Sequence, residues 1–155
     1  MTDRPVTLRE ITDANRDAVT ALSAGAAEGR FVASVAKSFR DAAETPEGNP
    51  WYRAIYAGDE PVGFVMLSWN VTPAPGIFGP WFLWRLLIDE RFQGRGYGRE
   101  TVRQIVELVR AEGATELLTS YVPSDDGPGR FYEKLGFTPT GDIDEGEIVI
   151  RLPID

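Results

Sequence analysis

The sequence predicts an α/β fold in which one mixed sheet of about seven strands is flanked by about four helices. Two half-buried patterns, Trp51–Tyr56 and Val62–Val71, lie on either side of turn residues 58–61 and predict an antiparallel hairpin. The segment Trp81–Ile88 is almost wholly apolar, which is typical of a central strand covered on both faces. Because hairpins accompany this central strand, the sheet is expected to be mixed rather than all parallel.

The first half of the chain supplies a strand and two helices before the hairpin. Residues Val6–Ile11 predict the first strand, and Asp13 is placed to cap a helix that carries Val19 and Leu22. A second helix is predicted from about Glu28 to Ala43, because apolar side chains recur on one face there. Those side chains are Phe31, Val32, Val35 and Phe39.

The second half predicts a long helix, a strand, a short helix and a final hairpin. Apolar residues at 102, 105, 106 and 109 share one side of a helix that runs from about Gly98 to Glu112. A strand follows at Thr115–Val122. Pro128 suits the first turn of a short helix, and Gly136 suits the left-handed position just after it.

A glycine-rich loop, residues 91–98, joins the central strand to the long helix. Gly94, Gly96 and Gly98 lack Cβ atoms, so the backbone there can turn tightly and approach a ligand closely. The first amides of the helix that follows have no partner within the helix. A strand, a glycine loop and a helix N-terminus together predict an anion site that fits a pyrophosphate.

The spacing of the loop excludes two common nucleotide motifs. The dinucleotide pattern GxGxxG is not met, because Arg99 or Thr101 stands where the last glycine belongs, and no Gly-Lys-Ser/Thr follows for an ATP-type loop. The pattern that remains is Gln-x-x-Gly-x-Gly, met by Gln93, Gly96 and Gly98. This pattern resembles the coenzyme A loop of the GCN5-related N-acetyltransferases.

Two further segments carry the same resemblance. Residues 131–137 read Phe-Tyr-Glu-Lys-Leu-Gly-Phe, which is similar to a short helix of that family leading into a strand. The ending from Thr138 to Leu152 resembles the branch that acetylates diamines and polyamines. The resemblance covers residues from about 62 to 152 well, and it implies a mostly antiparallel sheet. The length of 155 residues and the lack of a linker predict that residues 1–155 form a single domain.

The resemblance also implies acetyl-CoA as co-substrate and assigns roles to residues. Tyr132 would protonate the departing thiolate as general acid. The free backbone groups of the central strand, at Leu86, Leu87 and Ile88, would pair with the pantetheine arm. The residues that would hold the pyrophosphate are Gln93, Gly94, Arg95, Gly96, Tyr97, Gly98 and Arg99.

The base and the acceptor contacts are less directly indicated. Many relatives carry a glutamate on the central strand where this sequence has Trp84-Arg85. Glu147 is therefore our candidate for the base, acting through water, and the alternative is an amine that arrives already neutral. Glu145 and Trp84 are candidate acceptor contacts, because a carboxylate and an aromatic face both favour a cation. The alternatives are a solvated acidic turn and an aromatic core residue.

Composition excludes several kinds of catalytic site, metal site and partner. The 155 residues contain no cysteine and no histidine, which excludes thiol nucleophiles, Ser-His-Asp triads and the usual zinc sites, and no metal is expected. A net charge of −8 argues against a nucleic-acid partner. No stretch reads as a signal peptide or membrane span, so no membrane partner and a cytoplasmic location are expected. The family resemblance implies a homodimer.

The sequence thus predicts an acetyl-CoA-dependent N-acetyltransferase that acts on a primary amine of a small molecule, by direct transfer in a ternary complex. The resemblance favours a diamine or polyamine acceptor. Two alternatives remain open at this point. One is a non-catalytic acyl-CoA-binding or regulatory module, and the other is a protein or peptide N-acetyltransferase.

Overall fold

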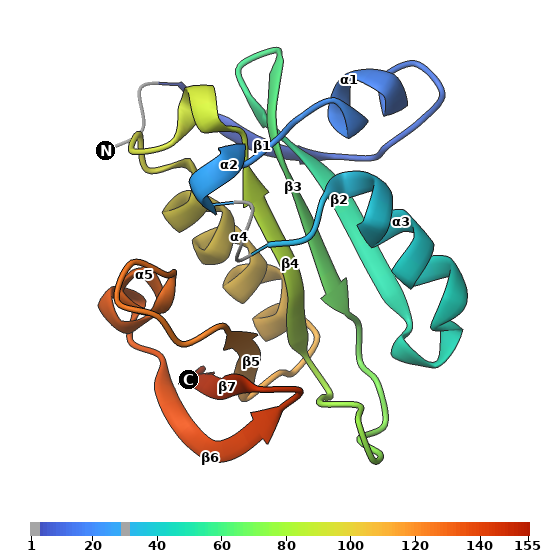
Figure 1. The fold of residues 1–155 in the computed structure, drawn as a ribbon. Helices are drawn as coiled ribbons and strands as arrows, with labels where there is room; N and C mark the ends of the chain where they lie inside the picture. Colours follow the sequence, from blue (N-terminus) through green and yellow to red (C-terminus); the bar gives the residue numbers. More distant parts are fainter. Residues whose placement is uncertain (1–3, 29–31) are drawn as a thin grey trace.

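The computed structural model describes residues 4–28 and 32–155. Within these residues, seven strands form one sheet in the order β1-β2-β3-β4-β5-β7-β6 (Figure 1). Every neighbouring pair is antiparallel except β4 and β5, which are parallel. This confirms the mixed, mostly antiparallel sheet. The strands are β1 Val6–Arg9, β2 Pro50–Ala57, β3 Glu60–Ser68, β4 Phe82–Ile88, β5 Glu116–Tyr121, β6 Thr138–Asp144 and β7 Glu147–Pro153.

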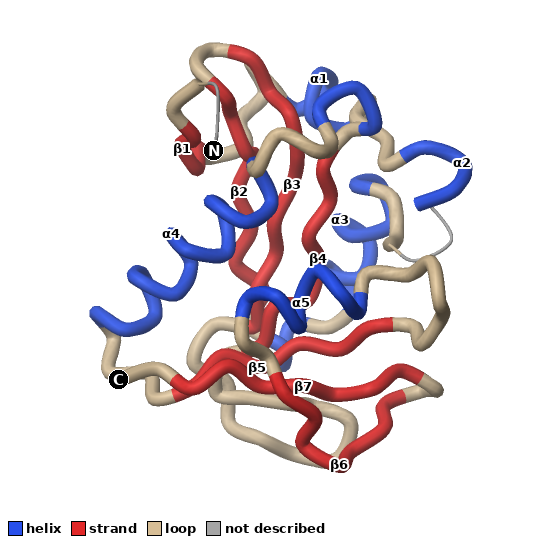
Figure 2. Tube along the Cα trace, turned by 90° about the vertical axis from the view of Figure 1, so that its left-hand side faces the viewer, coloured by secondary structure: helices blue, strands red, loops and turns tan. Residues whose placement is uncertain are grey.

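Helices cover both faces of the sheet. In Figure 2, α4 lies on one side of the first four strands and α3 on the other. The α-helices in the described part of the chain are α1 Arg16–Thr20, α2 Gly25–Glu28, α3 Val35–Glu44, α4 Tyr97–Ala111 and α5 Gly129–Leu135. Short 3-10 turns occupy Pro46–Gly48 and Glu90–Phe92.

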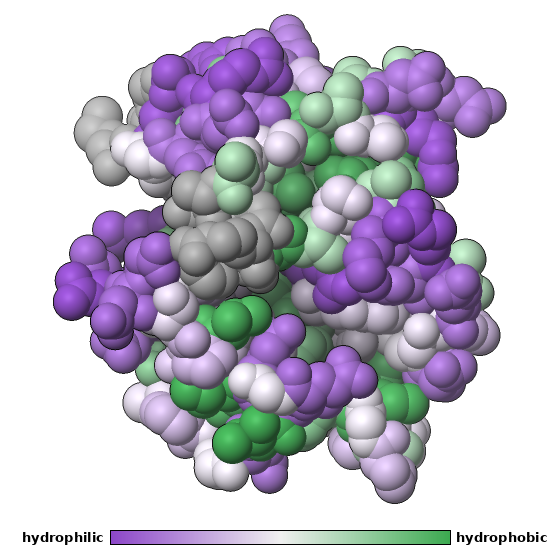
Figure 3. Space-filling view, viewed as in Figure 1, coloured by the Kyte–Doolittle hydropathy of each residue, from purple (hydrophilic) through white to green (hydrophobic). Residues whose placement is uncertain are grey.

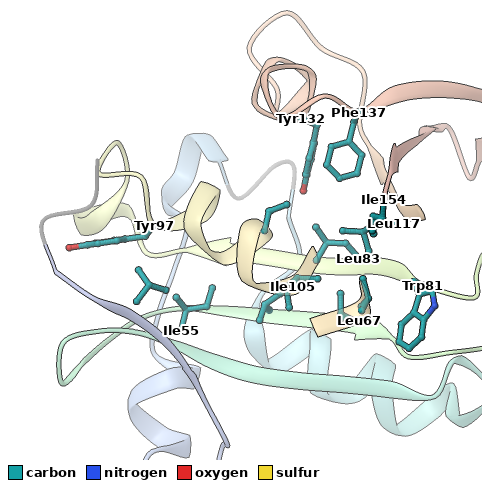
Figure 4. Packing of buried hydrophobic residues seen from close by; sticks show 14 of the residues in the cluster. Ile55, Leu67, Trp81, Leu83, Tyr97, Ile105, Leu117, Tyr132, Phe137 and Ile154 are labelled. Carbon is teal, nitrogen blue, oxygen red and sulfur yellow. The ribbon is translucent and has the colours of Figure 1, made fainter. Parts of the chain in front are cut away.

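Each face of the sheet carries its own hydrophobic core. On the α4 side, Val102, Ile105 and Val109 of the helix pack with strand residues that include Leu67 and Leu83. Figure 4 shows this cluster, with Tyr132 and Phe137 closing it from above. A second cluster lies on the α1 and α3 side. It is made mainly of Val19, Leu22, Val35, Ala42, Ala54, Phe64, Met66 and Leu87. Because β3 and β4 are covered on both faces, both faces carry apolar residues, and apolar and polar residues do not alternate along these strands.

Two predicted helix starts are wrong. The helix expected from Glu28 begins instead at Val35, where the Ser34 side chain accepts a hydrogen bond from the Lys37 amide. Residues 29–31 of the expected range, Phe31 among them, lie outside the described residues. Asp13 does not cap α1, because Asn15 occupies the cap position and its side chain accepts from the Thr12 amide.

The elements of the second half follow the prediction within two residues. Gly136 has φ 103° at the end of α5, which is the left-handed position that the sequence predicted. Pro128 stands just before the first turn of that helix. The glycine loop leads directly into α4, since Gly96 has φ 86° at its N-cap. The glycine loop, α4 and α5 therefore lie where the local sequence signals predicted them.

Candidate active site

The two parallel strands in the middle of the sheet separate along most of their length. Only Phe82 with Leu118 and Leu83 with Thr119 are paired between β4 and β5. On its other side β4 pairs with β3 as far as Ile88, but the register shifts so that Trp84 is an extra, bulged residue. From Trp84 onward, the edge of β4 that faces β5 makes no ladder with it.

A cleft of about 870 Å³ fills this separation. Leu86, Leu87 and Ile88 line it, as do residues of β5, α5 and the glycine loop. Figure 3 shows recessed apolar atoms over β4, with hydrophilic atoms of α3 beside them. The shape matches what an extended ligand arm needs, because backbone groups of a strand edge can pair with it.

The glycine loop closes one end of the cleft. Gly94 and Gly96 have φ 77° and 86°, values that L side chains rarely adopt, so the loop requires glycine at both positions. Gly94, Gly96, Tyr97, Gly98 and Arg99 all line the cleft. The amide groups at the start of the 15-residue helix α4 make this end suitable for a pyrophosphate.

Two predicted members of the loop have other roles in the structure. The Gln93 side chain lines the cleft and braces the loop, because its Nε2 donates to the carbonyls of Ile88 at 2.9 Å and Ala24 at 3.1 Å. Arg95 is not among the lining residues, and its guanidinium lies 5.7 Å from the centre of the Phe92 ring.

Asp89 supports the same end of the cleft and was not identified from the sequence. It is buried and accepts from the Ser23 amide at 3.0 Å, the Arg91 amide at 3.0 Å and Arg91 Nε at 2.8 Å. Burial raises the pKa of Asp89, but these hydrogen bonds outweigh it and hold the pKa below its ordinary value. The ionised carboxylate thus ties the segment before α2 to the end of β4.

Tyr132 lies at the middle of the cleft, where β4 and β5 part. It extends from α5 with its hydroxyl directed toward β4 (Figure 4), and only 8% of it is exposed. Burial raises the pKa of Tyr132 to about 12, assisted by the charge of Glu147 and opposed by a hydrogen bond with Thr119. Thr119 in turn donates to the carbonyl of Leu83 at 2.8 Å. The phenol therefore keeps its proton at neutral pH.

Glu147 reaches the same cleft from the start of β7. Its carboxylate Oε1 accepts a hydrogen bond from Ser120 Oγ at 2.9 Å, and both residues line the cleft. No local sequence signal points to Ser120, because it meets Glu147 only through the pairing of β5 with β7. Predicted acid and predicted base thus share one cavity.

A charged cluster of three residues, Arg85, Asp41 and Lys37, lies beside Trp84. Arg85 Nη2 is 2.5 Å from Asp41 Oδ2, and Lys37 Nζ is 2.9 Å from the same oxygen. Arg85 Nη1 also donates to the Trp84 carbonyl at 3.1 Å. Burial lowers the pKa of Arg85 while Asp41 and Glu147 raise it, and a guanidinium remains charged under all ordinary conditions.

Glu145 is placed elsewhere. It lies in the tight turn between β6 and β7, is exposed, and has φ 50°. It is not among the residues that line the cleft, whereas Trp84 is. The structure thus brings together all of the predicted site residues except Arg95 and Glu145.

The described residues offer neither a cluster of metal ligands nor a membrane-spanning helix. Residues 4–28 and 32–155 contain no group of three or more metal-ligating side chains that can hold a metal ion. The same described ranges contain no helix long and apolar enough to cross a membrane.

Known proteins share both the sequence pattern and this architecture. The model of the acetyltransferase (GNAT) family matches residues 15–137. Spermine/spermidine N(1)-acetyltransferase of Bacillus subtilis is 27% identical over 148 residues, which is 94% of this chain and 96% of that protein.

Solved structures show the same fold at lower identity. The PaiA N-acetyltransferase of Thermoplasma acidophilum, crystallised with coenzyme A, has a TM-score of 0.68 at 14% identity, over 96% of this chain and 99% of that one. A GNAT-family acetyltransferase of Elizabethkingia anophelis with acetyl-CoA bound has a TM-score of 0.64 at 13% identity, over 96% and 98%. With the family model covering most of its length, this chain belongs to the acetyltransferase (GNAT) family, as an N-acetyltransferase that uses acetyl-CoA.

Proposed function

We propose that the chain acetylates a primary amine of a small molecule, by direct transfer while acetyl-CoA and the amine are bound together. The observation that carries the proposal is that Tyr132 and Glu147 line one cleft where β4 and β5 separate. A relative named for spermine and spermidine supports a small amine as the acceptor.

Acetyl-CoA supplies an acetyl group held in a thioester. The glycine loop and the first turn of α4 offer backbone amides to its pyrophosphate. The β4 edge at Leu86–Ile88 offers backbone groups to the pantetheine arm, which directs the sulfur toward Tyr132. Holding thioester and amine in line supplies a large part of the rate, on the order of 7–11 kcal/mol for good alignment.

Proton transfers fall to two side chains. As the new carbon–nitrogen bond forms and the carbon–sulfur bond breaks, Tyr132 donates its phenolic proton to the leaving sulfur. Glu147, held by Ser120, accepts the proton that the amine loses, through a water molecule. Burial keeps the Tyr132 phenol protonated at neutral pH, so the proton that this role requires is present.

The test is an acetyl-transfer assay with acetyl-CoA and a panel of small primary amines, followed by thiol release and by mass of the product. We expect acetylated amine with the native protein. Tyr132→Phe is expected to lower kcat by about 10²–10⁴-fold and to leave coenzyme affinity unchanged. Tyr52→Phe is the matched control, because Tyr52 packs against Phe39 outside the cleft.

An absence of acetylated product from every amine of the panel, while coenzyme A still binds, would contradict the proposal. That outcome fits a non-catalytic acyl-CoA-binding module. Acetylation of peptide amines alone would instead point to a protein or peptide acceptor.

A further inference from the structure

Beside Trp84, the cleft is lined by two cations, which a site for a polyamine does not call for. Lys37 and Arg85 both line it, and Glu147 is the carboxylate beside them. The other lining carboxylate among the described residues is Asp126, which lies on the loop before α5. Glu145 of the last hairpin, the predicted acidic contact for a cationic acceptor, does not line the cleft.

Asp41 holds this cationic pair without neutralising it. One carboxylate is shared by Lys37 and Arg85, at 2.9 Å and 2.5 Å, so the three groups carry a formal net charge of +1. Lys37 and Arg85 line the cleft, whereas Asp41 is not among its lining residues.

Arg85 is fixed in place yet keeps hydrogen-bonding capacity. Its side chain is 18% exposed, and it donates to Asp41 and to the Trp84 carbonyl. A guanidinium has five N–H donors, so these two contacts leave donors unused. Nε is buried and has no partner among the described residues, so the donors left for a ligand are the second N–H groups of Nη1 and Nη2. The bulge at Trp84 and the ion pair with α3 give the guanidinium one orientation before any ligand arrives.

We propose that the acceptor carries an anionic group beside its amine, and that Arg85, with Lys37, recognises it. The class of acceptor is a small amino acid whose carboxylate lies at Arg85 while its amine lies at Glu147. Both residues line the cleft, and the charge of Glu147 acts on Arg85. A zwitterion presents opposite charges to this pair, whereas a polyamine places a second cation against Arg85 and Lys37. This inference rests on the proposed function and specifies its substrate.

The experiment compares matched acceptors that differ only in the anionic group. 4-Aminobutyrate is paired with 4-aminobutanamide and L-alanine with L-alaninamide, and spermidine and putrescine are added. We expect kcat/KM for at least one acid to exceed that of its amide by about tenfold or more. The amide of alanine has the less basic amine and hence more of the neutral nucleophile, so a preference for the acid runs against intrinsic reactivity.

Variants locate the preference at Arg85. Arg85→Gln is expected to raise KM for the preferred acid by about tenfold or more and to leave that of the amide unchanged. Arg85→Lys is expected to restore part of the loss, because it keeps the charge. Arg110→Gln, on the outer side of α4, is the matched control. The double variant Arg85→Gln/Asp41→Asn removes both charges of the ion pair. It tests the loss of acid preference without leaving the Asp41 carboxylate deprived of Arg85.

The outcomes distinguish failure of this inference from failure of the proposed function. If amides or polyamines are acetylated as well as the acids, or if Arg85→Gln affects all acceptors equally, the anionic subsite is wrong and the acetyltransferase proposal stands. If no amine is acetylated although coenzyme A binds, both are wrong.

Discussion

At the scale of single residues, the site depends on how two ordinary side chains are surrounded. Tyr132 is a phenol whose burial opposes ionisation, and Glu147 is a carboxylate whose orientation is set by one hydroxyl. Burial and the Glu147 charge act on Tyr132 in the same direction, so the proton that it donates is retained well above neutral pH.

The buried phenol predicts a specific loss of stability in alkali. Because the pKa of Tyr132 is about 12 when folded and about 10 when unfolded, the unfolded chain releases this proton first as the pH rises. The resulting stability is complete below pH 10 and is lost as the pH rises toward 12. Between pH 8 and 11 the free energy of unfolding of the native protein should fall by roughly 1 kcal/mol more than that of Tyr132→Phe, as measured by urea unfolding. Identical pH dependence in both proteins would contradict the assignment.

Ser120 and Glu147 predict a graded effect on catalysis. Glu147→Gln removes the proposed base and should lower kcat by about 10²-fold at neutral pH. Ser120→Ala leaves the carboxylate but frees its orientation, so a smaller fall of about tenfold is expected.

A pH series distinguishes a base from a residue that merely shapes the cleft. The deficit of Glu147→Gln should shrink as the pH rises, because more of the amine then arrives neutral. A deficit that is the same at pH 7 and pH 10 would contradict the role of Glu147. Glu145→Gln is the matched control from the neighbouring turn, outside the cleft.

At the scale of elements, β4 is held in place from one side so that its other edge can stay open. Its pairing with β3 extends through Gly63 and Ile88, while its pairing with β5 stops at Leu83. The floor of the cleft therefore depends on how closely β3 approaches β4. A side chain at Gly63 would meet the carbonyl oxygen of Leu87 and the side chains of Ile88 and Ile55.

Gly63→Ala tests this dependence. The added Cβ overlaps backbone rather than a flexible side chain, so the strands must shift. We expect the free energy of unfolding to fall by about 2 kcal/mol, within the range for overpacked cores, and coenzyme affinity to fall with it. Gly98→Ala is the contrasting variant, because its Cβ meets Phe131 at an ordinary 3.4 Å and should leave stability nearly unchanged. Chemical denaturation of both variants, with coenzyme titration of Gly63→Ala and the native protein, provides the measurement.

Elements with strong local signals were predictable, and contacts between distant segments were not. The backbone has positive φ at positions 94, 96 and 136, and the glycines in the sequence indicate such positions directly. The start of α3 was predicted too early, because apolar residues before Ser34 recur with the spacing of a helix. Arg85 meets Asp41 across 44 positions, and Ser120 meets Glu147 across 27, so neither contact leaves a local pattern.

At the scale of the whole molecule, the sheet consists of two parts joined at a short parallel ladder. Strands β1–β4 form one part and β5–β7 the other, with two paired positions between them. Tyr132, from α5, packs with Leu83 of β4 and Leu117 of β5 in one cluster with α4, so a shared core spans the separation (Figure 4). A ligand in the cleft contacts both parts, and its binding free energy adds to the stability of their association.

Acetyl-CoA should therefore raise the melting temperature of the native protein. At about 100 times its Kd, a ligand that binds only the folded state adds about 2.7 kcal/mol, which for a domain of this size corresponds to roughly 5–10 °C. Tyr132→Phe should show the same shift, because the proposed role of its hydroxyl is in transfer rather than in binding. Arg99→Gln should show a smaller one, since Arg99 lines the loop end of the cleft, and Arg110→Gln serves as its control. Differential scanning fluorimetry across a series of acetyl-CoA concentrations gives the melting temperature of all four proteins.

A native melting temperature that does not move at saturating acetyl-CoA would rule out this cleft as the coenzyme site, because tight binding to the folded state alone must stabilise that state.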